Sequence, residues 1–171
     1  MNKGKVYLSG PDRLLKDRVE RFVGYEKLCE KYDLILLKYP EELFKFSDTL
    51  ENNRKIAEER IRLIKECDIV IANAMDFRSY VEPYSEVGLE LGIAFSLGKK
   101  LYCYVPDLRT CAERYPGTTH VKENGKTVDE NGIGFEPGPL NVMLEQSSKL
   151  IKGDLEDALK VAHDDYYGGE D

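Results

Sequence analysis

Short apolar runs alternate with longer amphipathic stretches along this chain, and the two patterns predict buried strands and helices respectively. The apolar runs predict strands at residues 5–9, 34–37, 69–74 and 101–105, with a fifth, edge strand at 149–152. Apolar residues at helical spacing predict helices at residues 13–31, 52–66, 85–97, 108–114, 140–146 and 155–163. Regular alternation of strand and helix is typical of an α/β fold, so we expect a doubly wound parallel sheet of about five strands with helices on both faces.

Turn and capping residues separate these elements. Gly10-Pro11 ends the first strand, Asp12 is placed to cap the helix that follows, and Gly98 fits the end of the helix at 85–97. Residues 41–53 form a long irregular connection, and residues 115–139 read as a surface excursion. With no repeat and no linker, residues 1–171 predict a single domain whose last residues, 166–171, are frayed.

Composition and charge limit the classes of molecule that the protein is expected to bind. The net charge is −7 and no basic patch stands out, which argues against a nucleic-acid polymer and against an anionic membrane surface. The chain starts without an apolar signal core and has no stretch long enough to span a bilayer, so we expect a cytoplasmic protein. Four cysteines without a CxxC pair and only two histidines predict reduced, buried thiols and no metal site.

The segment from Glu82 to Gly98 carries two glutamates, Glu86 and Glu90, one helical turn apart. In a parallel sheet, the loops after the strands at 5–9, 69–74 and 101–105 share the edge where α/β folds place their ligands. Glu90 is surrounded by apolar neighbours, and a buried carboxylate is unfavourable unless it is paired or functional. Gly88 and Gly92 flank Glu90 closely, and we expect them to leave room for a ligand or another backbone to approach. Glu86 lies in a first helical turn, where the helix dipole alone favours a carboxylate.

Four segments, KVYLSGP, CDIVIANAMDFR, ELGIAFSLGKK and PLNVML, together resemble the nucleoside 2-deoxyribosyltransferase family. Their order and spacing match from Lys5 to about Ala162. The resemblance implies a flavodoxin-like sheet and an enzyme that cleaves the N-glycosidic bond of a 2′-deoxyribonucleoside and passes the sugar to a free nucleobase. It implies no metal and no organic cofactor.

The resemblance also implies roles for particular residues. Glu90 falls on the family's nucleophile, which forms a covalent bond to the sugar, and Tyr7 falls on the tyrosine that orients it. Phe77 and Arg78 match the substrate loop after the third strand. A close approach of the backbone at Gly10 or Gly92 is a candidate source of selectivity for the deoxyribose.

Two further residues imply a shared active site. Asn141 falls on an asparagine that a neighbouring subunit supplies to the 5′-hydroxyl end of the sugar, and Met143 on an apolar residue of the same segment. The resemblance therefore implies a homo-oligomer. Taken by themselves, these residues also fit simpler roles: Asn141 can start a helix, Met143 and Tyr7 can pack in a core, and Arg78 can hold a loop.

The chain departs from the family beside the nucleophile. The family's aspartate six residues before it is Tyr84 here, and a glycine position is Glu86. An acidic position on the preceding helix is Arg60. Base recognition and the identity of the acid that protonates the leaving base are therefore open. Glu86 is a candidate for that acid, and we expect Tyr84 and Glu86 to bind the substrate and decide the preference for it.

Three functions remain open on the sequence. The first is the transferase. The second is an N-glycoside hydrolase of deoxynucleosides or their 5′-monophosphates. Of these two substrates, Asn141 favours the one with a free 5′-hydroxyl. The third is a nucleotide-binding module without catalysis, which the altered Tyr84 and Glu86 positions allow. The preference for purine or pyrimidine is open as well.

Overall fold

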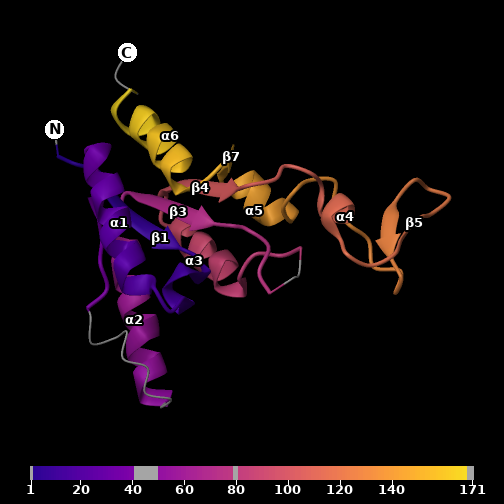
Figure 1. Ribbon diagram of the computed structural model, residues 1–171, viewed down its shortest axis with the longest axis horizontal. Helices are drawn as coiled ribbons and strands as arrows, with labels where there is room; N and C mark the ends of the chain where they lie inside the picture. Colours follow the sequence, from indigo (N-terminus) through magenta and orange to yellow (C-terminus); the bar gives the residue numbers. More distant parts are fainter. Residues whose placement is uncertain (1, 41–49, 79–80, 169–171) are drawn as a thin grey trace.

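Five parallel strands form the central sheet in the order β2-β1-β3-β4-β7 (Figure 1). The computed structural model describes residues 2–40, 50–78 and 81–168. The strands are β1 (Lys5–Ser9), β2 (Ile35–Leu36), β3 (Ile69–Asn73), β4 (Lys100–Val105) and β7 (Lys149–Lys152). This is the strand order of flavodoxin-like folds, with the reversal of the chain between β1 and β3. The predicted fold class is confirmed.

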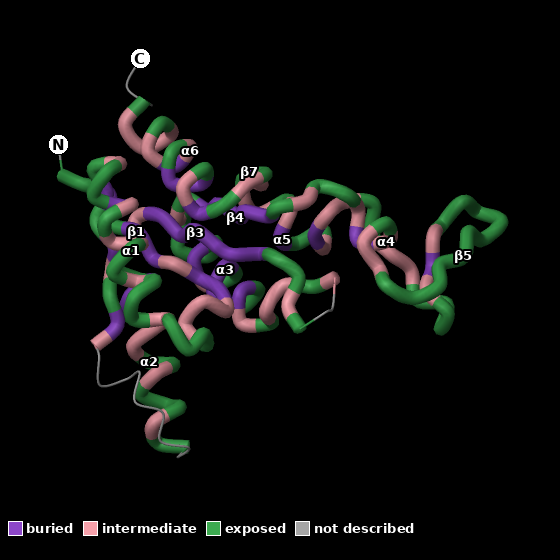
Figure 2. Tube along the Cα trace, viewed as in Figure 1, coloured by how far each residue is buried: buried purple, intermediate pink, exposed green. Residues whose placement is uncertain are grey.

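Helices cover both faces of this sheet. One face carries α1 (Arg18–Lys31) and α6 (Leu155–Tyr167), and the other carries α2 (Leu50–Glu66), α3 (Ser85–Ser96) and α5 (Val142–Ser147). Residues of β3 are buried throughout, as Figure 2 shows for the centre of the sheet. None of the helices in the described ranges is both long and apolar enough to cross a membrane.

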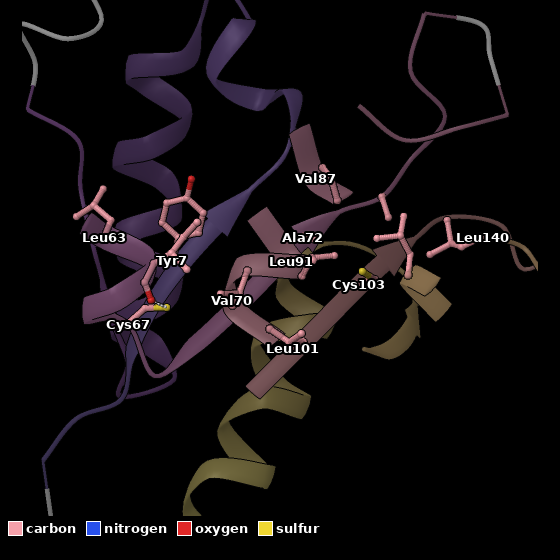
Figure 3. Close-up of a cluster of buried hydrophobic side chains, with 14 of the residues drawn as sticks. Tyr7, Leu63, Cys67, Val70, Ala72, Val87, Leu91, Leu101, Cys103 and Leu140 are labelled. Atoms are coloured by element: carbon pink, nitrogen blue, oxygen red, sulfur yellow. Dashed lines mark hydrogen bonds between the residues drawn. The ribbon is translucent and has the colours of Figure 1, made fainter. Parts of the chain in front are cut away.

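Alternation along the strands decides which side chains meet which helices. Val6, Ile69 and Ile71 belong to the core beneath α1 and α6. Tyr7 and Val70 belong to the core beneath α2 and α3, shown in Figure 3. Because successive residues of a strand point to opposite faces, Tyr7 and Ser9 both point toward α3.

The helix predicted at residues 13–31 is in fact two elements. A 3-10 turn, η1 (Pro11–Leu14), follows β1, and α1 begins only at Arg18. Asp12 does not cap a helix as predicted, because it lies inside the turn. Its carboxylate accepts hydrogen bonds from Asn73 Nδ2 at 2.7 Å and from the Tyr25 hydroxyl at 2.8 Å. Asp12 therefore ties the turn to the end of β3 and to α1.

The C-terminal helix is longer than predicted. Helix α6 continues to Tyr167, whose hydroxyl donates to the carbonyl oxygen of Asp33 at 2.8 Å. Tyr166 packs against the core beneath α1 and α6. These contacts hold residues that were expected to be frayed, and of the predicted tail only residues 169–171 lie outside the described chain.

Two connecting segments differ in detail from the prediction. The excursion contains an antiparallel hairpin of β5 (Thr119–Val121) and β6 (Thr127–Asp129), which projects away from the sheet (Figure 1). The helix before it, α4 (Cys111–Arg114), starts three residues later than predicted because Thr110 caps it through a capping box. Residues 50–53 of the long connection belong to α2, and residues 41–49 lie outside the described chain.

A pair of glycine substitutions tests the turn after β1. Gly10 has φ +146°, and an added Cβ would stand 2.7 Å from Asn73 Cβ. We expect Gly10→Ala to lower the free energy of unfolding by about 2 kcal/mol. Gly24 lies in α1 with open space around it, so Gly24→Ala should instead raise stability by about 0.5–1 kcal/mol. Chemical denaturation measures both, and equal effects of the two substitutions would contradict the constraint at Gly10.

Candidate functional site

A buried carboxylate, that of Glu90, occupies the carboxyl end of β1. Glu90 is 3% exposed and lies on the side of α3 that faces the sheet. The Tyr7 hydroxyl donates to Glu90 Oε1 at 2.7 Å, and Ser9 Oγ donates to Oε2 at 2.5 Å. Tyr7 and Ser9 are two residues apart on β1, so the strand presents both hydroxyls to one side chain. The predicted partnership of Tyr7 with Glu90 is thus present as a contact.

A second tyrosine supports the first. The hydroxyl groups of Tyr39 and Tyr7 lie 2.6 Å apart, and Tyr39 is 8% exposed. Because Tyr7 donates to Glu90, Tyr39 is the donor in this pair. Burial, reinforced by the charge of Glu90, raises the pKa of Tyr7 well above its usual value. Burial likewise raises the pKa of Tyr39 to about 12. Both phenols therefore remain protonated near neutral pH and keep their direction of donation.

Two arginines from different elements complete the cluster. Arg60, on α2, donates from Nε to Glu90 Oε1 at 2.6 Å and places Nη2 2.5 Å from Glu86 Oε2. Arg13, in η1, pairs with Glu86 through Nη2, and its Nη1 lies 3.9 Å from Glu90 Oε1. Nη1 of Arg13 also donates to the carbonyl oxygen of Gly10 at 2.8 Å. Two guanidinium groups thus face two carboxylates, and both arginine side chains are about one-tenth exposed.

The charges in this cluster stabilise one another. Burial acts to raise the pKa of Glu86, but the hydrogen bond and charge of Arg60 and the charge of Arg13 outweigh it and lower the pKa below its usual value. Burial acts to lower the pKa of Arg60, and the charge of Glu90 and the hydrogen bond to Glu86 reverse this effect and raise it. Glu86 is therefore an ionised partner of two arginines at neutral pH and holds no proton for a leaving group.

A row of stacked side chains continues from Arg13. Its guanidinium lies over the Tyr84 ring, 5.2 Å from the centroid, and the Tyr84 and Phe77 rings meet edge to face with centroids 4.9 Å apart. The guanidinium of Arg78 lies 5.0 Å from the centroid of Phe77. The structure thus brings the predicted residues Tyr84, Phe77 and Arg78 together beside Glu86. Aromatic faces of this kind can stack on a nucleobase.

The structure places Asn141 and Met143 elsewhere in this chain. Asn141 caps α5, its Oδ1 accepting from the Leu144 backbone N–H at 3.1 Å, and Met143 is 76% exposed. Both line an open groove of about 300 Å³ between α3 and α5, together with Gly88 and Gly92. Within one chain these two predicted substrate residues do not join the Glu90 cluster.

The room expected at Gly88 and Gly92 is on the wrong side of the helix for Glu90. Neither glycine has a neighbour within 4 Å of an added Cβ, so the space exists. Residues two positions apart on a helix point about 200° away from each other. The space therefore opens onto the groove beside α5, whereas Glu90 points to the sheet and α2. Of the two glycines considered for the approach to the sugar, Gly10 is the one beside the cluster.

Sequence reasoning missed Arg13 and Tyr39 and treated Arg60 only as a departure from the family. The signal that was available is physical: a glutamate in an apolar helix requires cations or hydroxyl donors from neighbouring elements. In the predicted topology, the neighbours of this helix are the turn after β1 and the helix before β3. Arg13 and Arg60 are the largely buried cations on these two elements. Ser9 follows from Tyr7 by the two-residue period of a strand.

No group of three or more potential metal ligands forms within residues 2–40, 50–78 and 81–168. The four cysteines are buried free thiols. Burial raises the pKa of Cys103 and of Cys67 to about 11, so these two groups remain protonated thiols.

Comparison with known proteins points to the same family that the four sequence segments resemble. The sequence profile of the nucleoside 2-deoxyribosyltransferase family matches residues 6–149. The fold is similar to a 2-desoxiribosyltransferase from Leishmania mexicana, with 26% sequence identity, a TM-score of 0.73 and coverage of 94% of this chain and 97% of that one. No curated protein matched in a separate sequence comparison.

Two more distant structures were also found. A 2-deoxyribosyltransferase from Bacillus psychrosaccharolyticus shares 18% identity at a TM-score of 0.47, covering 60% of this chain and 72% of that one. A CMP N-glycosidase from Clostridium botulinum shares 15% identity at a TM-score of 0.48, covering 92% and 97%. Because the family profile spans residues 6–149, most of the chain, this protein belongs to the nucleoside 2-deoxyribosyltransferase family.

Proposed function

We propose that this protein transfers 2-deoxyribose between nucleobases, cleaving the N-glycosidic bond of a 2′-deoxyribonucleoside through a covalent intermediate on Glu90. Membership of the family supports the reaction class. The observation that carries the proposal is the buried Glu90 carboxylate, held by Tyr7 and Ser9 at the carboxyl end of β1. Ligands of doubly wound sheets bind at this edge.

The hydrogen bonds of Glu90 distinguish its two oxygens. Tyr7 and Arg60 donate to Oε1, and Ser9 donates to Oε2. We assign the attack to Oε2, because it accepts from Ser9 and keeps a lone pair for C1′, whereas the lone pairs of Oε1 are engaged by Tyr7 and Arg60. After the attack, Oε1 becomes the carbonyl oxygen of the ester and still accepts from Tyr7. The donors on Oε1 thus fix the orientation of the nucleophile throughout the reaction.

The first chemical step forms a bond between Glu90 Oε2 and C1′ of the sugar and breaks the bond from C1′ to the base nitrogen. The electron pair of the broken bond leaves with the base. Positive charge develops on the sugar ring in the transition state, and the adjacent carboxylate stabilises it. A second base then attacks C1′ from the opposite side through a ring nitrogen, loses the proton of that nitrogen to water, and displaces Glu90 as a carboxylate, so the configuration at C1′ is retained overall.

The remaining predicted residues have proposed places around this centre. Tyr84, Phe77 and Arg78 contact the base, and the backbone at Gly10 approaches the sugar. Asn141 and Met143 come from a neighbouring copy in a homo-oligomer, which accounts for their position away from Glu90 in their own chain. Base exchange of this kind serves nucleotide salvage in the cytoplasm, without a metal or an organic cofactor.

An exchange assay tests the proposed function. The enzyme is mixed with a panel of 2′-deoxyribonucleosides, or their 5′-monophosphates, and a second free base, and the products are separated by chromatography. We expect a new 2′-deoxyribonucleoside that carries the second base. Release of free sugar without exchange would identify a hydrolase instead. Binding without turnover of any donor would identify a nucleotide-binding module.

A further inference from the structure

The glycosidic bond needs assistance at the leaving base as well as at the sugar, and the structure offers no carboxylic acid for this task among the described residues around Glu90. Glu86 is bound by two guanidinium groups, which lower its pKa. Asp12 already accepts hydrogen bonds from Asn73 Nδ2 and the Tyr25 hydroxyl, one on each carboxylate oxygen. Burial raises the pKa of the Tyr84 phenol, which makes it a weaker acid. Among these described residues, none is a carboxylic acid free to protonate the leaving base.

The charged group that lies beside Glu86, Glu90 and Tyr84 is the guanidinium of Arg13. Its guanidinium stacks on Tyr84, pairs with Glu86 and lies 3.9 Å from Glu90 Oε1. A nucleophilic oxygen lies about 3–3.5 Å from the carbon it attacks, so the leaving nitrogen on the far side of C1′ lies about 5 Å from the carboxylate. Arg13 lies within 4 Å of that carboxylate and stacks on Tyr84, the residue assigned above to the base, so it is the cation closest to the acceptor atoms of a base held there among the described residues that contact Glu90 and Tyr84.

We propose, on the basis of the function proposed above, that Arg13 assists departure of the nucleobase by donating hydrogen bonds to the anion that forms as the glycosidic bond breaks. The bond from Glu90 to C1′ forms, the bond from C1′ to the base nitrogen breaks, and the base takes the electron pair. The released base later takes a proton from water. No acid in the protein changes its protonation state.

The charges of the cluster balance in both states. Before the step, Arg13 and Arg60 face the charges of Glu86 and Glu90. After it, Glu90 is a neutral ester and its negative charge has moved to the base, while Glu86 is unchanged. The same two guanidinium groups therefore compensate two negative charges before and after. Preorganised donors aimed at a developing charge are an effective means of lowering a barrier.

The test compares donor nucleosides in pairs, and the two donors of each pair differ in the stability of the leaving anion. The pairs are 2′-deoxyuridine with its 5-fluoro derivative, and a purine deoxyriboside with its 6-chloro derivative, so that either base preference is covered. In Arg13→Met we expect kcat/KM for the poorer leaving group to fall roughly 10²–10³-fold, with a clearly smaller fall for the better one. The ratio of the two donors does not depend on how much enzyme is folded. Added guanidinium ion should restore part of the lost rate.

Matched variants give the controls. Arg21 pairs with Asp17 on the exposed surface of α1, so Arg21→Met should leave the donor ratio unchanged. Arg13→Lys keeps the charge and should retain more activity toward the poorer donor than Arg13→Met. Equal losses for both donors in Arg13→Met, or a change of the donor ratio in Glu86→Gln but not in Arg13→Met, would overturn the role of Arg13. Absence of turnover with every donor in the wild type would overturn the proposed function instead.

Discussion

Glu90→Gln should lower the rate of base exchange by about 10⁴-fold or more, because removal of a nucleophile from a site whose groups act together has an effect of this order. Glutamine has nearly the same shape as glutamate, so the packing beneath α3 is preserved. Its amide oxygen can still accept from Tyr7. It cannot form a stable ester with the sugar, and it places no negative charge beside the developing oxocarbenium ion. Steady-state exchange, measured with the best donor of the panel, gives the result.

Glu86→Gln is the matched control for this substitution. Glu86 is one helical turn before Glu90 and shares its arginines, but it is partly exposed and holds none of the hydroxyl donors of β1. We expect Glu86→Gln to reduce exchange far less than Glu90→Gln. Exchange within a few-fold of wild type in Glu90→Gln would show that another group attacks the sugar. A loss in Glu86→Gln as large as that in Glu90→Gln would show that the two carboxylates share the role.

Arg60→Met should destabilise the fold by about 3 kcal/mol, because removing one partner of a buried ion pair leaves the Glu90 charge poorly compensated, with Arg13 at 3.9 Å as its nearest cation among the described residues. The side chains of Arg60 and Glu90 are 11% and 4% exposed, so water replaces the lost contact poorly. Methionine fills much of the same volume, which limits the effect of a cavity. Unfolding by denaturant, read as a change of the midpoint at constant slope, measures the loss.

A double substitution separates the ion pair from packing. If the cost of Arg60→Met comes from the uncompensated carboxylate, then adding Glu90→Gln removes that charge and makes the double variant more stable than the sum of the single losses predicts. Arg62 lies two residues along α2 but is half exposed, with Glu59 and Glu66 as partners. Arg62→Met should change stability by no more than about 0.5 kcal/mol. Strict additivity of Arg60→Met and Glu90→Gln would contradict the coupling.

The sheet could be predicted from the sequence because its strands are short apolar runs between helical patterns. Ile69 to Asn73 is buried throughout and lies at the centre of the sheet, as its continuous apolar character predicts. Asp12 could not be placed in the same way. A carboxylate after a glycine and a proline resembles a helix cap, and only the tertiary structure brings Asn73 and Tyr25 to it. Contacts at long range therefore overrode a local capping rule.

The candidate site was predictable on β1 and α3 and unpredictable on the elements that cover it. Tyr7 and Glu90 lie on elements with clear periodicity, and their contact follows from the topology. Arg60 lies on a helix rich in charged residues, where most arginines pair on the surface, as Arg62 does. The sequence does not say which of them turns inward. The position of Asn141 at the far side of α3 depends on packing between helices, which no local pattern encodes.

Covalent attachment of the sugar to Glu90 can be measured directly by mass spectrometry. A 2′-deoxyribonucleoside that carries fluorine at C2′ destabilises positive charge on the sugar and should slow both the formation and the breakdown of the intermediate, so that it accumulates under excess donor. We expect the mass of one fluorinated deoxyribosyl group added to the protein, on the peptide that contains Glu90, and the absence of this added mass in Glu90→Gln. Turnover of ordinary donors together with a label on a different residue, or with the same label in Glu90→Gln, would contradict this expectation.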